Sequence, residues 1–327
     1  MPQATTPRPN LRPWYVWLAA FYAAWAFVVF GLGHTATALA HWPIAVAMAA
    51  GSYAAGSTPM GGGTVAFPIL VLLFGESPQL GRDFSFAAQS VGMVSATLFV
   101  LARRQPLAWP ALRGALAGST LGVPIGVLLV APHVSALWIK LVFATLWGSF
   151  GVLHLWRIGS IAAQTETVPA DAAWAPRAGF VVGLLSGATV VAVAGVGTDM
   201  MLYTALVLLG RADLRIAIPT AVCAMAWASV VGLVTKLATG GLQPGVFAHW
   251  LAAAPVVVVG APFGAFVVAR IGRKPTLAVV AVLCVGQLFG TLHSERATLG
   301  VGGVLAALAA VGACLFGFEA LRRRGTR

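Results

Sequence analysis

The chain has 327 residues, of which 59% are hydrophobic and 9% are charged. Soluble domains carry about 25% charged residues, so this sequence lacks the charge that a soluble surface needs. Lipid-facing helices need no charge, and a membrane fold explains the deficit. The net charge of +12 does not indicate nucleic-acid binding, because the basic residues lie at the ends of apolar segments.

Apolar segments recur along the whole chain and predict an all-α polytopic membrane protein. They cover residues 14–32, 43–75, 79–102, 109–131, 134–156, 177–210, 212–236, 245–269, 276–292 and 297–320. The first is longer than the apolar core of a signal peptide, so we expect a retained helix rather than a cleaved signal.

Two of these segments, 43–75 and 177–210, are too long for a simple crossing. Each exceeds 30 residues, which as one helix would span about 50 Å, whereas the hydrocarbon core is about 30 Å thick. A glycine-rich interruption divides each segment, at Ser57–Thr64 in the first and at Gly195–Asp199 in the second. Each segment is therefore either a tilted, broken crossing or a re-entrant hairpin.

The distribution of basic residues favours hairpins. With two hairpins and a cytoplasmic N-terminus, the cytoplasmic side collects all of the 20 basic residues except Arg82, Lys140, Lys236 and Arg296. Simple crossings would move the loop that contains Arg103 and Arg104 outside, against the positive-inside rule. We therefore expect eight crossings, two hairpins and cytoplasmic termini in a bacterial inner membrane. Lys140 and Lys236, near helix ends, are expected to snorkel toward water.

The chain also repeats itself. Gly61–Thr64 (GGGT) resembles Gly195–Thr198 (GVGT), and Gly122–Gly126 (GVPIG) resembles Gly260–Gly264 (GAPFG). Each copy is a hairpin plus three crossings, and an odd number of crossings inverts the second copy. This predicts an inverted repeat, a transporter architecture with the substrate near the midplane. The predicted units are 1–42 (tail and first helix), 43–156 (first repeat), 157–176 (cytoplasmic linker), 177–292 (second repeat) and 293–327 (last helix and basic tail).

The two interruptions are the candidate substrate site. Helices that start near Thr64 and Thr198 would direct N-terminal N–H groups at the centre, which suits an anion. Non-helical backbone at membrane depth is tolerated where it is buried in protein or lines a cavity. The alternative is that the glycines only permit close helix packing. The candidate binding residues here are Ser57, Thr58, Gly61, Gly62, Gly63, Thr64, Gly195, Gly197 and Thr198.

Further polar residues lie on or beside the helices that follow. Gln89, Ser90 and Thr220 are candidates to complete the substrate site, or make ordinary hydrogen bonds between helices. Asp199 is the only acid that we place deep in the membrane, where acids are costly and usually functional. It is a candidate for proton coupling, and capping of the half-helix is the equally weighted alternative.

Other small residues point to packing. Gly114, Gly118, Gly122 and Gly126 follow a four-residue spacing, which predicts a close-packing helix face. Cys223, Cys284 and Cys314 lie in apolar segments, and neither they nor the histidines form a metal-binding motif. We expect no metal and no cofactor.

The motifs carry a family resemblance. Ser57–Pro68 (STPMGGGTVAFP), followed by Gln89 and Ser90, resembles the first half of the sulfite exporter (TauE/SafE) family of anion permeases. Gly195–Met201 (GVGTDMM), followed by Pro219 and Thr220, resembles its second half. The resemblance covers roughly residues 43–292. It implies transport of sulfite, sulfonates or related sulfur-containing anions, outward in some members and inward in others.

The leading functional hypothesis is a secondary transporter of a small sulfur-containing anion. An anion channel, or a transporter of a carboxylate or another small metabolite, is the alternative. A membrane enzyme is disfavoured because no acid, base and nucleophile cluster in the sequence, and an assembly subunit would not need duplicated polar interruptions. The expected partners are the anion, the lipid bilayer and, for coupling, protons. The oligomeric state stays open.

Overall fold

The computed structural model describes residues 9–164, 166, 173–271 and 274–325. The regular secondary structure within them is helical apart from one isolated bridge between Glu166 and Ala212. Nine helices in this part of the chain are long and apolar enough to cross a membrane. The predicted all-α polytopic membrane fold is therefore confirmed. The helices are α1 (Arg12–Ala26), α2 (Thr35–Ala40), α3 (Trp42–Ser57), α4 (Gly63–Pro68), α5 (Pro78–Ala102), α6 (Trp109–Ile125), α7 (Ala136–Ala162), α8 (Trp174–Ser186), α9 (Ala192–Ala194), α10 (Thr198–Leu208), α11 (Leu214–Ala238), α12 (Val246–Ile271), α13 (Lys274–Ser294) and α14 (Arg296–Gly325).

Side-chain caps set the starts of several long helices. Ser77 precedes α5 and accepts a hydrogen bond from the backbone N–H of Leu80 at 3.1 Å. Asp213 precedes α11 and accepts one from the N–H of Arg215 at 2.6 Å. Such caps satisfy N–H groups that have no partner within the helix. Wider π-helical turns extend α1 to Gly31, α4 to Leu73, α6 to Val130 and α8 to Val191.

The segment formed by α3 and α4 begins and ends at the same end of the bundle. His41, directly before α3, packs against His249 with the ring centroids 4.8 Å apart. Glu76, shortly after α4, places a carboxylate oxygen 3.5 Å from Nε2 of the same His249. Because both flanks meet one residue at the start of α12, the chain enters and leaves this segment on one side, as a hairpin does.

The segment formed by α8, α9 and α10 has the same property. Trp174 opens α8, and a methyl group on Gly210, just after α10, would lie 3.0 Å from its indole. Residues Trp174–Ala194 are long enough to count among the nine possible spans. The chain nevertheless reverses at Gly195 and returns to the same end of the bundle. The number of crossings is therefore one fewer than the number of helices that are long enough to cross.

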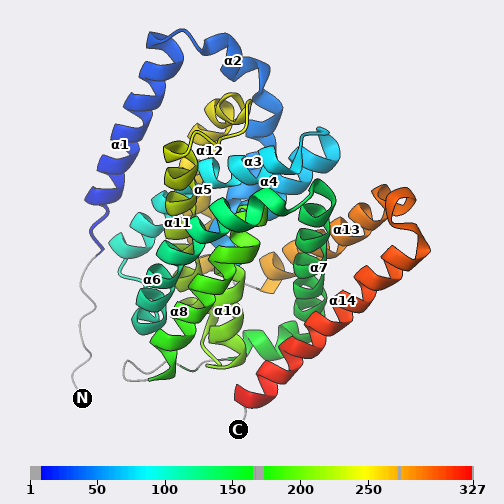
Figure 1. Ribbon diagram of the computed structural model, residues 1–327. Coiled ribbons are helices and arrows are strands. Elements are labelled where there is room, and N and C mark those ends of the chain that lie inside the picture. The colour runs from blue at the N-terminus through cyan, green and yellow to red at the C-terminus, as the bar shows by residue number, and fades with distance from the viewer. Residues whose placement is uncertain (1–8, 165, 167–172, 272–273, 326–327) are drawn as a thin grey trace, which may run out of the picture.

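The two terminal helices, α1 and α14, lie at the periphery of the bundle (Figure 1). The N–H of Asn10, before α1, donates to the carbonyl of Ala102 at the end of α5 (3.0 Å). No residue of α1 is buried. α14 packs along α7, and Arg157 pairs with Glu319 near its C-terminal end. Both helices therefore flank the bundle that the two hairpins enter.

The core helices pack in pairs that correspond between the two halves. The first arm of each hairpin packs against a helix of the other half, α3 against α12 and α8 against α6. Equivalent helices also meet each other, α5 against α11 and α7 against α13. This arrangement is the one that two related halves require. The inverted relation between them stays a prediction.

The glycine ladder of α6 makes the predicted close packing. A methyl group on Gly114, Gly118 or Gly122 would lie 2.1–2.2 Å from a carbonyl oxygen of α8. On the other side of the bundle, one on Gly56 of α3 would lie 1.7 Å from the carbonyl oxygen of Ala261 in α12. The prediction of a packing face is confirmed, and small residues let these backbones approach each other.

One prediction about a charged residue is wrong. Lys236 does not snorkel: its side chain is buried, with Nζ 3.4 Å from Asp83 Oδ2 and 2.7 Å from the carbonyl oxygen of Gly241. Asp83, near the start of α5, is also fully buried and accepts from Arg82 at 2.7 Å. Arg82 and Lys236 together compensate the charge of the Asp83 carboxylate. Their positions in the sequence did not reveal this pairing.

Gly118→Ala should destabilise the protein, because the new methyl group meets the backbone carbonyl of Phe180 and forces α6 away from α8. The expected cost is about 1–3 kcal/mol. Gly286→Ala on α13 is the matched control, since nothing lies within 4 Å of the position of its methyl group. Thermal unfolding of both variants in detergent measures the difference. Equal melting temperatures would contradict the close approach.

The orientation of the bundle is tested by cysteine labelling. We expect an impermeant maleimide to label His133→Cys, between α6 and α7, in intact cells and to leave Arg104→Cys, between α5 and α6, unlabelled. Both positions are exposed in the structure, so a difference reports the side of the membrane. Labelling after lysis controls for reactivity. Labelling of position 104 alone in intact cells would reverse the orientation.

Candidate functional site

Two breaks interrupt the hairpins. The first break is residues 58–62, between α3 and α4, and the second break is residues 195–197, between α9 and α10. Gly61, Gly195 and Gly197 have φ values of +69°, +78° and +132°, a region that side chains disfavour. The half-helices begin at Gly63 and Thr198, as the sequence predicted. The glycines therefore turn the chain where each half-helix starts.

The two breaks touch each other although they lie more than a hundred residues apart. A methyl group on Gly61 would lie 2.6 Å from Asp199 Oδ2, and one on Gly63 would lie 2.2 Å from Val196. No larger residue fits at either position without displacement of the facing break. Gly61 and Gly63 thus permit direct contact between the first hairpin and Val196 and Asp199 of the second.

Gln89 on α5 joins the two breaks. Its Nε2 donates to the carbonyl of Gly195 in the second break (3.0 Å) and to that of Ser85 on its own helix (3.1 Å). Its Oε1 borders the first break, 3.1 Å from the position of a methyl group on Gly61. The amide thus satisfies a non-helical carbonyl that has no helical partner.

Trp147 on α7 contacts the start of α4 and the second break. Its indole N–H donates to Thr64 Oγ1 at 2.6 Å, and its ring lies 3.4 Å from the position of a methyl group on Gly197. The ring stacks on Phe143 with the centroids 4.3 Å apart. Sequence analysis missed this residue, because one tryptophan in an apolar segment carries no pattern.

The predicted hydroxyl donors are bonded within the protein. The hydroxyls of Ser57, Thr58 and Thr64 donate to backbone carbonyls in the preceding turn, those of Tyr53, Ala54 and Met60. Thr198 Oγ1 pairs with Ser186 Oγ at 3.0 Å. A hydroxyl has one hydrogen to donate, so an anion would have to compete with these acceptors.

Three further predicted residues do not contribute to the contact between the breaks. Ser90 Oγ donates to the carbonyl of Ala87 at 2.9 Å, one position along α5 from Gln89 and on another face. Thr220 Oγ1 donates to the carbonyl of Ile216 and accepts from the N–H of Ala108 at 3.0 Å. Thr220 therefore holds the start of α6. Gly62 lies in the first break and faces Ala55 rather than the second break.

Asp199 lies in the first turn of α10 and is fully buried. Gly197 occupies the N-cap position, and Asp199 follows it in the first turn. Its Oδ1 accepts from the N–H of Met200 at 2.9 Å. Its Oδ2 has no hydrogen-bond partner in the described part of the chain. A negative charge is favoured near a helix N-terminus, and this second oxygen stays unsatisfied.

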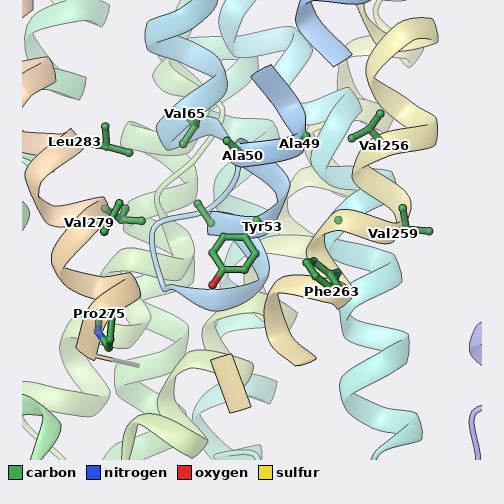
Figure 2. Close-up of a pocket in the computed structure, with 13 residues that line it drawn as sticks. Ala49, Ala50, Tyr53, Val65, Val256, Val259, Phe263, Pro275, Val279 and Leu283 are labelled. Carbon is green, nitrogen blue, oxygen red and sulfur yellow. The ribbon is translucent and has the colours of Figure 1, made fainter. Parts of the chain in front are cut away.

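The space around the breaks is small. A cavity of ≈ 10 Å³ borders Gly62 and Gln89, with room for about one water molecule. An open groove of ≈ 810 Å³ lies between α3, α12 and α13, where Figure 2 shows Tyr53, Phe263 and Val279 along its sides. Apart from Tyr53, the side chains of the described residues that line this groove carry no polar group, so they offer an anion few donors. The breaks remain the candidate site, in a closed arrangement.

Gly61→Ala should abolish or strongly reduce transport, because the methyl group meets Asp199 Oδ2 and the positive φ adds roughly 1–2 kcal/mol of strain. Gly62→Ala is the control in the same break, since its nearest neighbour would be Ala55 Cβ at an ordinary 3.4 Å. Flux in proteoliposomes, normalised to folded protein, measures both. Equal activity would show that the breaks do not need their contact.

A family model described as sulfite exporter TauE/SafE matches residues 43–290. The match includes both breaks and the helices that hold them. Comparisons with curated proteins and with solved structures gave no match. Because the match covers more than half of the chain and contains both halves of the site, this protein belongs to the sulfite exporter TauE/SafE family.

Proposed function

We propose that the protein is a secondary transporter of sulfite, a sulfonate or a related small sulfur-containing anion. The family supplies the transport class. The observation that carries the proposal is the contact between Gly61–Gly63 and Val196–Asp199, where two half-helices begin next to each other. Free N–H groups and the positive end of the dipole at such starts attract anions.

The anion would bind between the two breaks. Residues Gly63–Leu73 and Thr198–Leu208 each form an apolar helix that leads away from the contact, so both dipoles favour negative charge there. The hydroxyls of Thr64 and Thr198 can rotate from their present acceptors toward the three oxygens of a sulfonate or sulfite. Neutral donors hold an anion without the strong trapping that a buried arginine would cause. Arg82, the nearest cation on α5, is paired with Asp83.

The closed contact supports a carrier rather than a pore. Gly63 and Val196 touch, and the adjacent cavity of ≈ 10 Å³ is too small for a sulfur oxyanion. Binding therefore requires the first break to part from the second. Since the breaks belong to different halves, movement of one half against the other opens the site, which is alternating access.

Transport by purified protein in proteoliposomes tests this function. The substrates are sulfite, thiosulfate, sulfonates and carboxylates, each offered at increasing concentration. We expect saturable uptake of at least one sulfur-containing anion and competition among the anions that bind. Flux that rises linearly with concentration would favour a channel, and saturable flux of carboxylates alone would reject a sulfur-anion substrate.

Thr64→Val and Thr198→Val should each weaken anion binding by about tenfold or more, because each removes a donor to a charged acceptor. Thr189→Val is the control: its exposed hydroxyl makes an equivalent bond to Leu185, one turn back. Thermal shifts with each anion report binding, and the unliganded melting temperature reports folding. Wild-type affinity in both threonine variants would place the site elsewhere.

A further inference from the structure

Two buried acceptor oxygens face the same glycine without a hydrogen-bond donor. They are Oδ2 of Asp199 and Oε1 of Gln89, and neither has a partner in the described part of the chain. Both border the position that a methyl group on Gly61 would occupy, at 2.6 and 3.1 Å. Gln89 is 3% exposed and Asp199 is fully buried. An unsatisfied polar atom in such a place costs free energy.

The orientation of the Gln89 amide follows from its neighbours. Its nitrogen donates to two carbonyl oxygens, those of Gly195 and Ser85. A flipped amide would place its oxygen against both carbonyls and lose both bonds. Oε1 is therefore fixed toward the first break, as an acceptor that cannot turn away.

We infer that Asp199 binds the coupling proton and that, in the closed state, its protonated carboxyl donates to Oε1 of Gln89. This inference rests on the proposed transport function. Protonation converts Oδ2 from an acceptor into a donor, which satisfies both orphan oxygens at once. A charged Asp199 would leave both acceptor oxygens that face Gly61 without a donor and a buried charge without a cation.

Other ionisable groups near this pair have partners of their own. Arg82, whose carbonyl touches Gly195, pairs with Asp83 on α5. His154 on α7 contacts the hydroxyl of Tyr203, one turn beyond Asp199 on α10. Cys284 on α13 contacts Met60 in the first break. α4 carries no ionisable side chain.

The remaining helices that pack on α10 bring their ionisable groups mostly to the ends of the bundle. They are Arg113 on α6, Arg177 on α8, Arg215, Cys223 and Lys236 on α11, and Arg296, Cys314, Glu319 and Arg322–Arg324 on α14. In the described part of the chain, none of them hydrogen-bonds to Asp199 Oδ2. Asp199 is thus the group at the contact whose charge can change the fit of the breaks.

Protonation of Asp199 also favours binding of the anion. A charged carboxylate beside the half-helix starts would repel the anion, and protonation removes this repulsion. The proton comes from water on the side where the breaks are open and returns to water on the opposite side, with no other bond made or broken. Anion and proton therefore move in the same direction.

The test uses proteoliposomes with a trapped pH-sensitive dye and an imposed pH gradient. In the wild type, an acidic exterior should drive accumulation of the anion, with acidification of the lumen that depends on the anion. Asp199→Asn supplies a permanent amide donor to Gln89, so exchange of internal for external anion should persist while the response to the pH gradient and the proton movement disappear. Asp213→Asn, which keeps a capping side chain at α11, should retain wild-type coupling.

Gln89→Leu tests the hydrogen bond between Asp199 and Gln89, whereas Asp199→Asn tests the acid by itself. Loss of the acceptor should make the protonated form less stable and move the midpoint of the pH–rate profile down by about one pH unit. An unchanged profile in this variant, or a wild-type gradient response in Asp199→Asn, overturns the inference. If anion flux in the wild type does not respond to the pH gradient, the inference about Asp199 is wrong and the proposed transport function stands. If no anion flux occurs at any pH, both are wrong.

Discussion

Non-helical backbone inside a membrane must find its hydrogen-bond partners within the protein, and the arrangement around the two breaks follows from that requirement. Gly195 lies in a left-handed turn and its carbonyl accepts from Gln89 on α5. Thr64, at the start of the first half-helix, accepts from Trp147 on α7. Two long helices are thereby tied to both breaks, and the side chains that stabilise the interruptions also bring them into contact.

Close backbone packing supports this centre from the sides. α6 and α8 approach through glycines until a methyl group would collide with a carbonyl, and α3 and α12 do the same across the bundle. Each hairpin arm is therefore held against the other half of the protein. A movement that parts Gly63 from Val196 must carry whole helices with it, because packed interfaces have discrete arrangements rather than continuous ones.

The sequence predicted the features that depend on local chemistry. Segment length and glycine interruptions located both breaks, and four-residue glycine spacing located the face of α6. Features that depend on how the helices are rotated relative to each other could not be predicted from the sequence. Gln89 and Ser90 are adjacent, yet only Gln89 reaches the breaks, since neighbours on a helix point about 100° apart. The pairing of Asp83 with Lys236 and the bond between Trp147 and Thr64 join residues whose spacing follows no period.

A closed site rich in acceptors is consistent with anion transport once binding is considered with release. The donors that suit an oxyanion are bonded to protein acceptors, as Thr64 is to Met60, so an arriving anion gains only the difference between two sets of hydrogen bonds. Modest net binding lets the anion leave on the other side. Asp199 adds a condition, because its charge opposes the anion and its proton removes that opposition. A site built only of free donors would bind an anion whether or not a proton is bound. A carboxylate beside the fixed Oε1 of Gln89 instead makes closure of the site depend on a second, smaller ligand, the proton. Transport can then be driven by whichever gradient supplies that ligand.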